Sequence, residues 1–244
     1  MAKKIRADVL LVDRGLVESR EKARALILAG KVYVGEVRVD KAGDTLLPDA
    51  NVEVRGESLP YVSRGGVKLK GALDAFQFNP TGKVCADFGA STGGFTDCLL
   101  QGGATRVYAI DVGYGQLHEK LRKDDRVVVM ERVNARHLNE SSLPERVDVV
   151  VIDASFIGLA KLLPAAKAVL KDGGDILAMV KPQFEVGRDA IGKNGVVRDD
   201  VARAQAIDDV ASSAHELGLR EKQRVDAVIR GPEGNHEAFL WLAK

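Results

Sequence analysis

From residue 84 onward, short apolar runs alternate with stretches whose apolar residues recur at helical spacing. The runs that we predict as strands cover residues 84–88, 107–110, 127–130, 147–152, 176–180, 225–229 and 238–242. The stretches that we predict as helices cover residues 95–100, 117–122, 159–170 and 199–217. This alternation is typical of a mostly parallel sheet with helices on both faces. Because a short turn at 231–234 joins the last two strands, we expect an antiparallel edge on that sheet.

The segments before residue 84 predict two further features. Ser63 is a good N-cap residue, apolar side chains follow it at helical spacing as far as Phe76, and Pro80 cannot continue a helix. One helix should therefore lead into the sheet.

Residues 1–60 differ in character from the rest of the chain. Ser19 can cap a helix that Gly30 would end, and alternating apolar residues over 31–39 and 52–54 predict a small unit of strands. We therefore expect a small α+β domain at 1–60 and an α/β domain at 61–244.

The charge balance limits the kinds of partner that the chain can bind. The chain carries 36 Lys+Arg against 35 Asp+Glu, a formal net charge of +1. This excludes a polybasic protein whose affinity for nucleic acid rests on bulk charge. Locally, residues 1–24 contain seven basic and four acidic side chains, so a small positioned patch remains compatible with RNA binding.

The scarcity of long apolar runs, cysteines and spaced histidines predicts the compartment and the metal content. No apolar run approaches the roughly 20 residues of a membrane-spanning helix, and no apolar core follows the basic N-terminus as in a signal peptide. We expect a cytoplasmic protein with no membrane partner. Cys85 and Cys98 are too few for a disulfide framework, and the four histidines lack metal-ligand spacing, so we expect no metal.

A loop of small residues follows the first predicted strand and opens a helix. In open α/β sheets this is where an adenosine-bearing ligand binds. Ser91 stands where a dinucleotide fingerprint needs glycine, and Asp87 would repel a pyrophosphate but suits an ammonium and a sulfonium. Asp111, closing the second strand, can accept hydrogen bonds from a ribose diol. These features favour S-adenosylmethionine over NAD, with contacts predicted at Asp87, Gly89, Ser91, Thr92, Gly93, Gly94, Phe95, Thr96, Asp111 and Asp153.

Ionisable residues stand at the ends of other predicted elements. Asp153 ends the fourth strand, Lys181 ends the fifth, Lys68 lies in the helix before the sheet and Glu237 begins the last strand. Chemistry gathers at the carboxyl ends of parallel strands, so Asp153 and Lys181 should share a site with the loop. A lysine desolvated beside another cation can act as a base, as methyl transfer to a ribose hydroxyl requires. A surface ion pair is the alternative, above all for Lys68 and Glu237.

Two other methyl-transfer chemistries are disfavoured. The segment Asp153–Phe156 reads Asp-Ala-Ser-Phe and lacks the prolines typical of amino-group methylation of bases. Methylation of pyrimidine carbon 5 needs a nucleophilic cysteine, whereas Cys85 falls within a strand and Cys98 within a helix.

Five segments in order resemble a known family. They are YVSRGGVKL at 61–69, DFGASTGGFTD at 87–97, DASF at 153–156, KPQFE at 181–185 and GPEGN at 231–235. Together they are similar to the TlyA (hemolysin A) family, which joins an S4 RNA-binding domain to an FtsJ-like methyltransferase domain. Residues 6–54 resemble the S4 module. The resemblance implies a Rossmann-like methyltransferase sheet preceded by a small α+β S4 domain.

The resemblance also implies an activity, namely 2′-O-methylation of cytidine ribose in 16S and/or 23S ribosomal RNA, with ribosomal RNA or ribosomal subunits as partners. Carried over by motif, the family's catalytic tetrad falls on Lys68, Asp153, Lys181 and Glu237. Lys181, oriented by Asp153, would take the proton of the 2′-hydroxyl, while Lys68 and Glu237 position the ribose. RNA contacts are expected from Arg6, Arg14, Arg20, Lys22, Arg24, Lys31 and Arg64.

Two other functions stay open on this reading. One is a membrane-acting hemolysin, suggested by the family's second name, and the other is a non-catalytic S4 protein of ribosome assembly. Methyl transfer to ribosomal subunits, assayed beside hemolysis, discriminates among the three.

Overall fold

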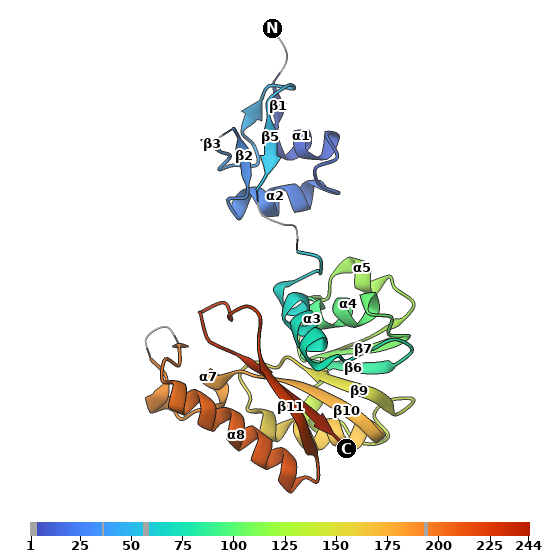
Figure 1. Ribbon diagram of the computed structural model, residues 1–244. Coiled ribbons are helices and arrows are strands. Elements are labelled where there is room, and N and C mark those ends of the chain that lie inside the picture. The colour runs from blue at the N-terminus through green and yellow to red at the C-terminus, as the bar shows by residue number, and fades with distance from the viewer. Residues whose placement is uncertain (1–3, 36, 56–58, 193–194) are drawn as a thin grey trace. The chain divides into compact units, whose positions relative to one another are not determined.

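The computed structural model describes residues 4–35, 37–55, 59–192 and 195–244. The chain divides into two compact units, Met1–Ser58 and Leu59–Lys244 (Figure 1). Each unit has a hydrophobic core of its own.

The described residues of the first unit form two short helices and five very short strands. Its elements are β1 (Ile5–Arg6), α1 (Ala7–Asp13), α2 (Arg20–Leu28), β2 (Val32–Val34), β3 (Val37–Arg38), β4 (Thr45–Leu46) and β5 (Val52–Val54). The Ser19 side chain accepts a hydrogen bond from the Lys22 amide at 3.2 Å, and Gly30 takes a positive φ of 67°, so α2 begins and ends where the sequence predicts. The strands form the sheet β3-β2-β5 and a separate antiparallel pair of β1 with β4. The pattern did not predict that pair.

The second unit is built on a seven-stranded sheet. Its strands are β6 (Val84–Phe88), β7 (Arg106–Asp111), β8 (Val127–Glu131), β9 (Val147–Ile152), β10 (Leu170–Val180), β11 (Arg220–Asp226) and β12 (Ala238–Ala243). Their order is β11-β12-β10-β9-β6-β7-β8. Pairing is parallel from β10 to β8, whereas β12 is antiparallel to both β10 and β11. The predicted α/β fold with an antiparallel edge is confirmed, with β12 inserted one position inside β11.

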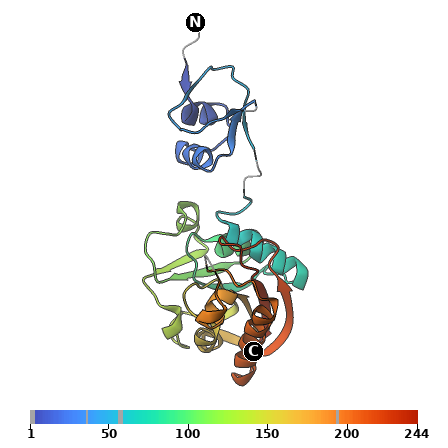
Figure 2. The same cartoon turned by 90° about the vertical axis from the view of Figure 1, so that its left-hand side faces the viewer.

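Helices cover both faces of this sheet (Figures 1 and 2). They are α3 (Arg64–Phe76), α4 (Gly94–Gln101), α5 (Glu119–Arg122), α6 (Leu163–Val169), α7 (Pro182–Glu185) and α8 (Asp200–Glu216). Alternate residues of each strand enter opposite cores. Val150 and Ile152 pack on the face of α6 and α8, whereas Val149 and Val151 pack on the face of α3 and α4.

Three elements differ from the predicted pattern. The strand expected over 176–180 begins six residues earlier, as β10 (Leu170–Val180). The helix expected over 159–170 is divided into a 3₁₀ turn, Leu159–Lys161, and α6, because Pro164 in the first turn of α6 has no amide hydrogen to continue an earlier helix. The strand expected over 225–229 lies instead at β11, whose first residues are charged and largely exposed, so its apolar pattern is weak.

The order of strands reverses beside β6, whose neighbours are β7 on one side and β9 on the other. Ligands of open α/β sheets bind in the crevice at this reversal, outside the carboxyl ends of the strands. The loop after β6 and Asp153 after β9 meet there, since the Asp153 amide donates to the Phe88 carbonyl at 3.0 Å.

Candidate active site

The loop between β6 and α4 can be made only with glycine at two positions. Gly89 has a φ of 87°, and a Cβ placed on it would lie 2.7 Å from the Asp153 carbonyl oxygen. Gly93 has a φ of 98°, and a Cβ there would collide with the side chain of Leu121. Both conformations are strained for residues with side chains, and both positions are closed by neighbours. The loop is therefore fixed against α5 and the end of β9.

Asp87, near the end of β6, fixes the far end of this loop. Its Oδ2 accepts hydrogen bonds from the Thr96 amide at 3.0 Å and the Thr96 hydroxyl at 2.7 Å. Asp87 is fully buried, and no described residue bonds its Oδ1. Burial raises the pKa of this carboxyl to about 7, with a smaller contribution from the negative charge of Asp153. Asp87 thus ties β6 to the first turn of α4.

Asp111, at the end of β7, holds the loop from the side. Its Oδ2 accepts from the Ser91 amide at 2.8 Å and its Oδ1 accepts from the Gly113 amide at 2.7 Å. Carboxylate oxygens have further lone pairs, so Asp111 can still accept from a ligand.

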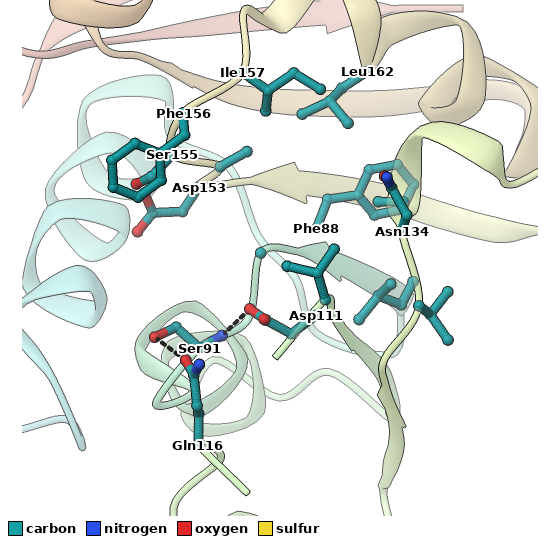
Figure 3. A pocket seen from close by; sticks show the side chains of 16 residues that line it. Phe88, Ser91, Asp111, Gln116, Asn134, Asp153, Ser155, Phe156, Ile157 and Leu162 are labelled. Carbon is teal, nitrogen blue, oxygen red and sulfur yellow. Dashed lines mark hydrogen bonds between the residues drawn. The ribbon is translucent and has the colours of Figure 1, made fainter. Parts of the chain in front are cut away.

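A cavity of about 340 Å³ opens beside Asp111. Figure 3 shows Asp111 and Ser91 on one side of it, with Ile157 and Leu162 on the opposite side. Its other walls are mostly apolar, and its volume lies in the usual range for small-molecule sites. The lining residues are Phe88, Gly89, Ser91, Ile110, Asp111, Val112, Gln116, Val133, Asn134, Ala135, Asp153, Ala154, Ser155, Phe156, Ile157 and Leu162.

Sequence reasoning missed part of this wall. Val133, Asn134 and Ala135 follow β8, the third strand, and were not singled out. The strand-end rule that found Asp87, Asp111 and Asp153 would have found them had it been applied to β8.

A second cavity, of about 700 Å³, adjoins the first. The residues that line both are Gly89, Ser91, Asp153, Ser155 and Phe156. Of the predicted cofactor contacts, Thr92, Gly94 and Phe95 line this second cavity, whereas Asp87, Gly93 and Thr96 line neither. All four residues of the predicted tetrad, Lys68, Asp153, Lys181 and Glu237, line the second cavity.

The tetrad forms two ion pairs. Lys181 Nζ lies 2.6 Å from Asp153 Oδ1 and also donates to Ser155 Oγ at 2.9 Å, so two partners orient the amine. Its side chain is 11% exposed and that of Asp153 is 23% exposed, so the pair faces the cavity.

The other pair is more deeply buried. Lys68 in α3 donates to Glu237 Oε2 immediately before β12, and their side chains are 7% and 1% exposed. Burial excludes the exposed surface pair that the sequence left open for these two residues. Gly231 makes room for Glu237, since a Cβ at that glycine would lie 2.8 Å from Glu237 Oε1.

An exposed aromatic residue stands where the two cavities meet. Phe156 has a φ of 65°, which is rare outside glycine, and is 92% exposed. Its ring centroid lies 5.3 Å from that of Phe184, which also lines the second cavity. The strained backbone holds an apolar ring in solvent beside the Lys181–Asp153 pair.

The basic residues predicted to contact RNA have varied surroundings. Arg14 donates to the carbonyls of Ala50, at 2.6 Å, and Pro48, while Lys22 lies 3.4 Å from Glu18. Arg6, Arg20 and Arg24 all bond one carboxylate, that of Asp8.

Two further residues complete this predicted set. Lys31 immediately precedes β2 and is partly exposed. Arg64, in the second unit, is exposed, donates to the Arg230 carbonyl at 3.0 Å and lines the larger cavity.

Other predicted features concern metals, thiols and membranes. Cys85 and Cys98 are buried free thiols, and desolvation raises the pKa of each to about 12. Within the described ranges, no group of three or more His, Cys, Asp or Glu side chains could hold a metal ion. Over the same residues, no helix has both the length and the apolar character to cross a membrane.

Comparisons with known proteins agree with this architecture. Residues 61–244 match the model of the FtsJ-like methyltransferase family, and residues 5–52 match the S4 domain. The 16S/23S rRNA (cytidine-2′-O)-methyltransferase TlyA of Mycobacterium tuberculosis is 47% identical over 243 residues, covering 99% of this chain and 91% of the relative. Hemolysin A of Brachyspira hyodysenteriae is 40% identical over 234 residues, covering 96% and 97%.

A solved structure from Streptococcus thermophilus, provisionally named a hemolysin, is 42% identical and superposes with a TM-score of 0.78, covering 100% of this chain and 90% of that one. The match to the family model extends over most of the chain, and the relatives align over nearly its full length. The chain belongs to the FtsJ-like methyltransferases, within the TlyA (hemolysin A) family that joins such a domain to an S4 domain.

Proposed function

We propose that this protein is an S-adenosylmethionine-dependent methyltransferase that methylates the 2′-hydroxyl of cytidine in ribosomal RNA. The observation that carries the proposal is the meeting of two cavities at Asp153, one suited to the cofactor and one lined by two lysine–carboxylate pairs. The relative from Mycobacterium tuberculosis, named for this reaction, supports cytidine in ribosomal RNA as the substrate.

The smaller cavity fits S-adenosylmethionine by the chemistry of its walls. The apolar side chains of Ile110, Val133 and Leu162 suit an adenine ring, and the carboxylate of Asp111 suits a ribose diol. The absence of a side chain at Gly89 lets the loop backbone pack against the end of β9, since a Cβ there would lie 2.7 Å from the Asp153 carbonyl oxygen. When bound, the cofactor supplies an electrophilic methyl group on a sulfonium. Asp111, Asn134 and the loop from Gly89 to Phe95 would hold it.

Lys181 is the proposed base. A ribose hydroxyl is a very weak acid, so its oxygen becomes a good nucleophile only as its proton is taken away. After releasing its own proton to solvent, the amine of Lys181 would accept the hydroxyl proton, while Asp153 and Ser155 hold the amine in place and stabilise the ammonium that results.

Lys68 and Glu237 are proposed to position the ribose. Their pair lies in the wall of the same cavity but is nearly closed to solvent, which suits a fixed donor and acceptor better than a proton shuttle. Phe156 would support the base of the target nucleotide, because an exposed ring at a cavity mouth offers a stacking surface.

The test measures transfer of a labelled methyl group from S-adenosylmethionine to purified ribosomal subunits, followed by mapping of 2′-O-methylated positions. We expect labelling of cytidines by the wild-type protein and at least a hundredfold loss for Lys181→Ala, the magnitude typical of removing a general base. Lys171→Ala is the matched control, because Lys171 pairs with Asp148 at 2.7 Å outside both cavities. Cofactor binding, measured by calorimetry, should be retained by both variants.

Two results would overturn the proposal. One is methyl transfer at the wild-type rate by a folded Lys181→Ala protein, which would show that Lys181 is not the base. The other is lysis of red cells, assayed in parallel, by a preparation that transfers no methyl group.

A further inference from the structure

One carboxylate in the first unit gathers three arginines. Asp8, in the first turn of α1, is fully buried. Arg6 donates to it through Nε at 2.9 Å and Nη2 at 3.2 Å, Arg20 through Nη2 at 3.0 Å, and Arg24 through Nε at 3.2 Å. Arg6 belongs to β1, while Arg20 and Arg24 lie one turn apart on α2. We name these four residues the Asp8 cluster.

The cluster is closed on one side and open on the other. The side chain of Asp8 is 0% exposed, whereas those of Arg6, Arg20 and Arg24 are 48%, 47% and 51% exposed. Each guanidinium has five N–H groups and uses only one or two of them on Asp8. Because the three side chains are about half exposed, the carboxylate holds the arginines in place and leaves most of their N–H donors accessible to a ligand.

Charge in the cluster stays positive. Three guanidinium groups share one buried carboxylate, and they hold the pKa of Asp8 well below its ordinary value. Glu21 is a second carboxylate that the charges of Arg20 and Arg24 reach. Even with Glu21 counted, three positive charges outnumber two negative ones. An anion fits the open side of such a group.

We propose that Asp8 is a positioning residue that arranges Arg6, Arg20 and Arg24 into one binding site for phosphates of the RNA backbone. The inference rests on the proposed function, since it takes RNA as the ligand. A planar guanidinium binds phosphate oxygens through paired N–H groups, so its orientation matters as much as its charge. Free arginine side chains lose rotamer entropy on binding, and prior fixing by Asp8 removes much of that loss.

Two other ion pairs among the described residues of this unit lack the buried carboxylate that carries the proposal. Arg38 lies 2.7 Å from Asp40, but that carboxylate is 63% exposed, and Glu18, the partner of Lys22, is 85% exposed. An exposed carboxylate holds its partner weakly, and its negative charge would repel an incoming phosphate.

The experiment replaces Asp8 in the full chain. Asp8→Asn removes a negative charge, so attraction by charge alone predicts tighter RNA binding, whereas loss of positioning predicts weaker binding. We expect the dissociation constant for ribosomal subunits to rise about tenfold. Affinity for a homopolymer such as poly(U), which follows charge, should stay the same or increase. Asp40→Asn is the matched control with the same change of charge at an exposed pair, and it should not weaken subunit binding.

If Asp8→Asn prevents the first unit from folding, circular dichroism will detect it. A second variant then tests the proposal without changing Asp8. Arg24→Lys keeps the charge but removes the guanidinium, and it should weaken subunit binding several-fold relative to Arg38→Lys. Unweakened subunit binding by a folded Asp8→Asn protein would overturn the proposal. If Asp8→Asn does not fold, equal binding by the two arginine variants would overturn it.

Failure of the proposed function gives a different result. Methyl transfer at saturating subunits should reach the wild-type kcat in Asp8→Asn, with only KM raised. A wild-type protein that binds subunits but transfers no methyl group would contradict the proposed function and leave the Asp8 cluster intact.

Discussion

Asp8 and Asp87 are both fully buried carboxylates, and their surroundings give them opposite protonation behaviour. Asp8 receives donors from three arginines, which lower its pKa. Asp87 has only the hydrogen bonds of Thr96 and an oxygen without a described partner, so burial raises its pKa to about 7. At the scale of a residue, the number of positive partners decides whether burial favours or opposes the charged form.

Asp87 should make the second unit less stable as pH rises. Its folded pKa lies above the value of 3.8 for an unperturbed carboxyl, so between about pH 4 and pH 7 the native state holds a proton that the unfolded chain has released. The free energy of unfolding therefore declines across this window. Asp87→Asn should abolish that decline and gain stability relative to wild type from pH 5 to pH 8. Urea unfolding followed by fluorescence of Trp241, the single tryptophan, measures it; parallel pH slopes in the two proteins would contradict the assignment.

Gly93 should be intolerant of alanine for two separable reasons. Gly82 has a similar φ of 75° but no atom within 4 Å of a built Cβ, so Gly82→Ala carries the backbone cost alone, about 1 kcal/mol. Gly93→Ala adds the collision with Leu121 and should cost about 3 kcal/mol. Urea unfolding of both variants measures the difference. Equal losses would show that Leu121 moves aside freely.

Sequence reasoning at this scale succeeded where position along a strand decides a residue's place. Asp153, Lys181 and Asp111 follow or close predicted strands, and they line the cavities at the expected edge of the sheet. It failed for Asp8, which was not singled out, because two of its three arginine partners come from another element, 12 and 16 residues away. No periodicity records such a contact.

Among elements, apolar strands were predicted well and polar or very short ones were not. The core strands β6 and β9 are predominantly apolar, with one aspartate each, and their bounds match those expected. The edge strand β11 was displaced, and β1 and β4 are two residues each, too short for an alternation. A strand at an edge is held by its neighbour's backbone, which leaves little trace in its own side chains.

The contact of α3 with the start of β12 gives a prediction for two elements at once. Lys68→Met leaves Glu237 buried without its partner and should cost about 3–5 kcal/mol, and Glu237→Gln should also destabilise. The double variant should recover part of the loss, because neither charge is then left alone. Tryptophan fluorescence in urea measures the cycle. Additive losses would show that the two charges do not stabilise each other.

For the whole molecule, near-neutral charge limits binding that depends on charge alone. With a net charge of +1, the chain has little general attraction for polyanions, and its predicted RNA contacts are confined to small groups of residues. The near-balance that excluded a polybasic binder is thus consistent with a positioned RNA site such as the Asp8 cluster.

Competition tests this expectation. Excess poly(A) at about 0.15 M salt should leave methyl transfer to ribosomal subunits nearly unchanged, because charge screening weakens its non-specific contacts. Unmodified subunits from a strain that lacks the gene should compete fully. Strong inhibition by poly(A) would instead indicate binding through bulk charge.

The place of β12 between β10 and β11 sets the order in which the parts of the site form during synthesis. Glu237 precedes this last strand by one residue, and its partner Lys68 lies 169 positions earlier in the chain. At elongation rates of about 5–20 residues per second, the cofactor loop is synthesised on the order of ten seconds before Glu237. During that interval a nascent chain can form the loop but not the wall of the larger cavity. Catalytic competence therefore arrives only after every other strand of the sheet has been made.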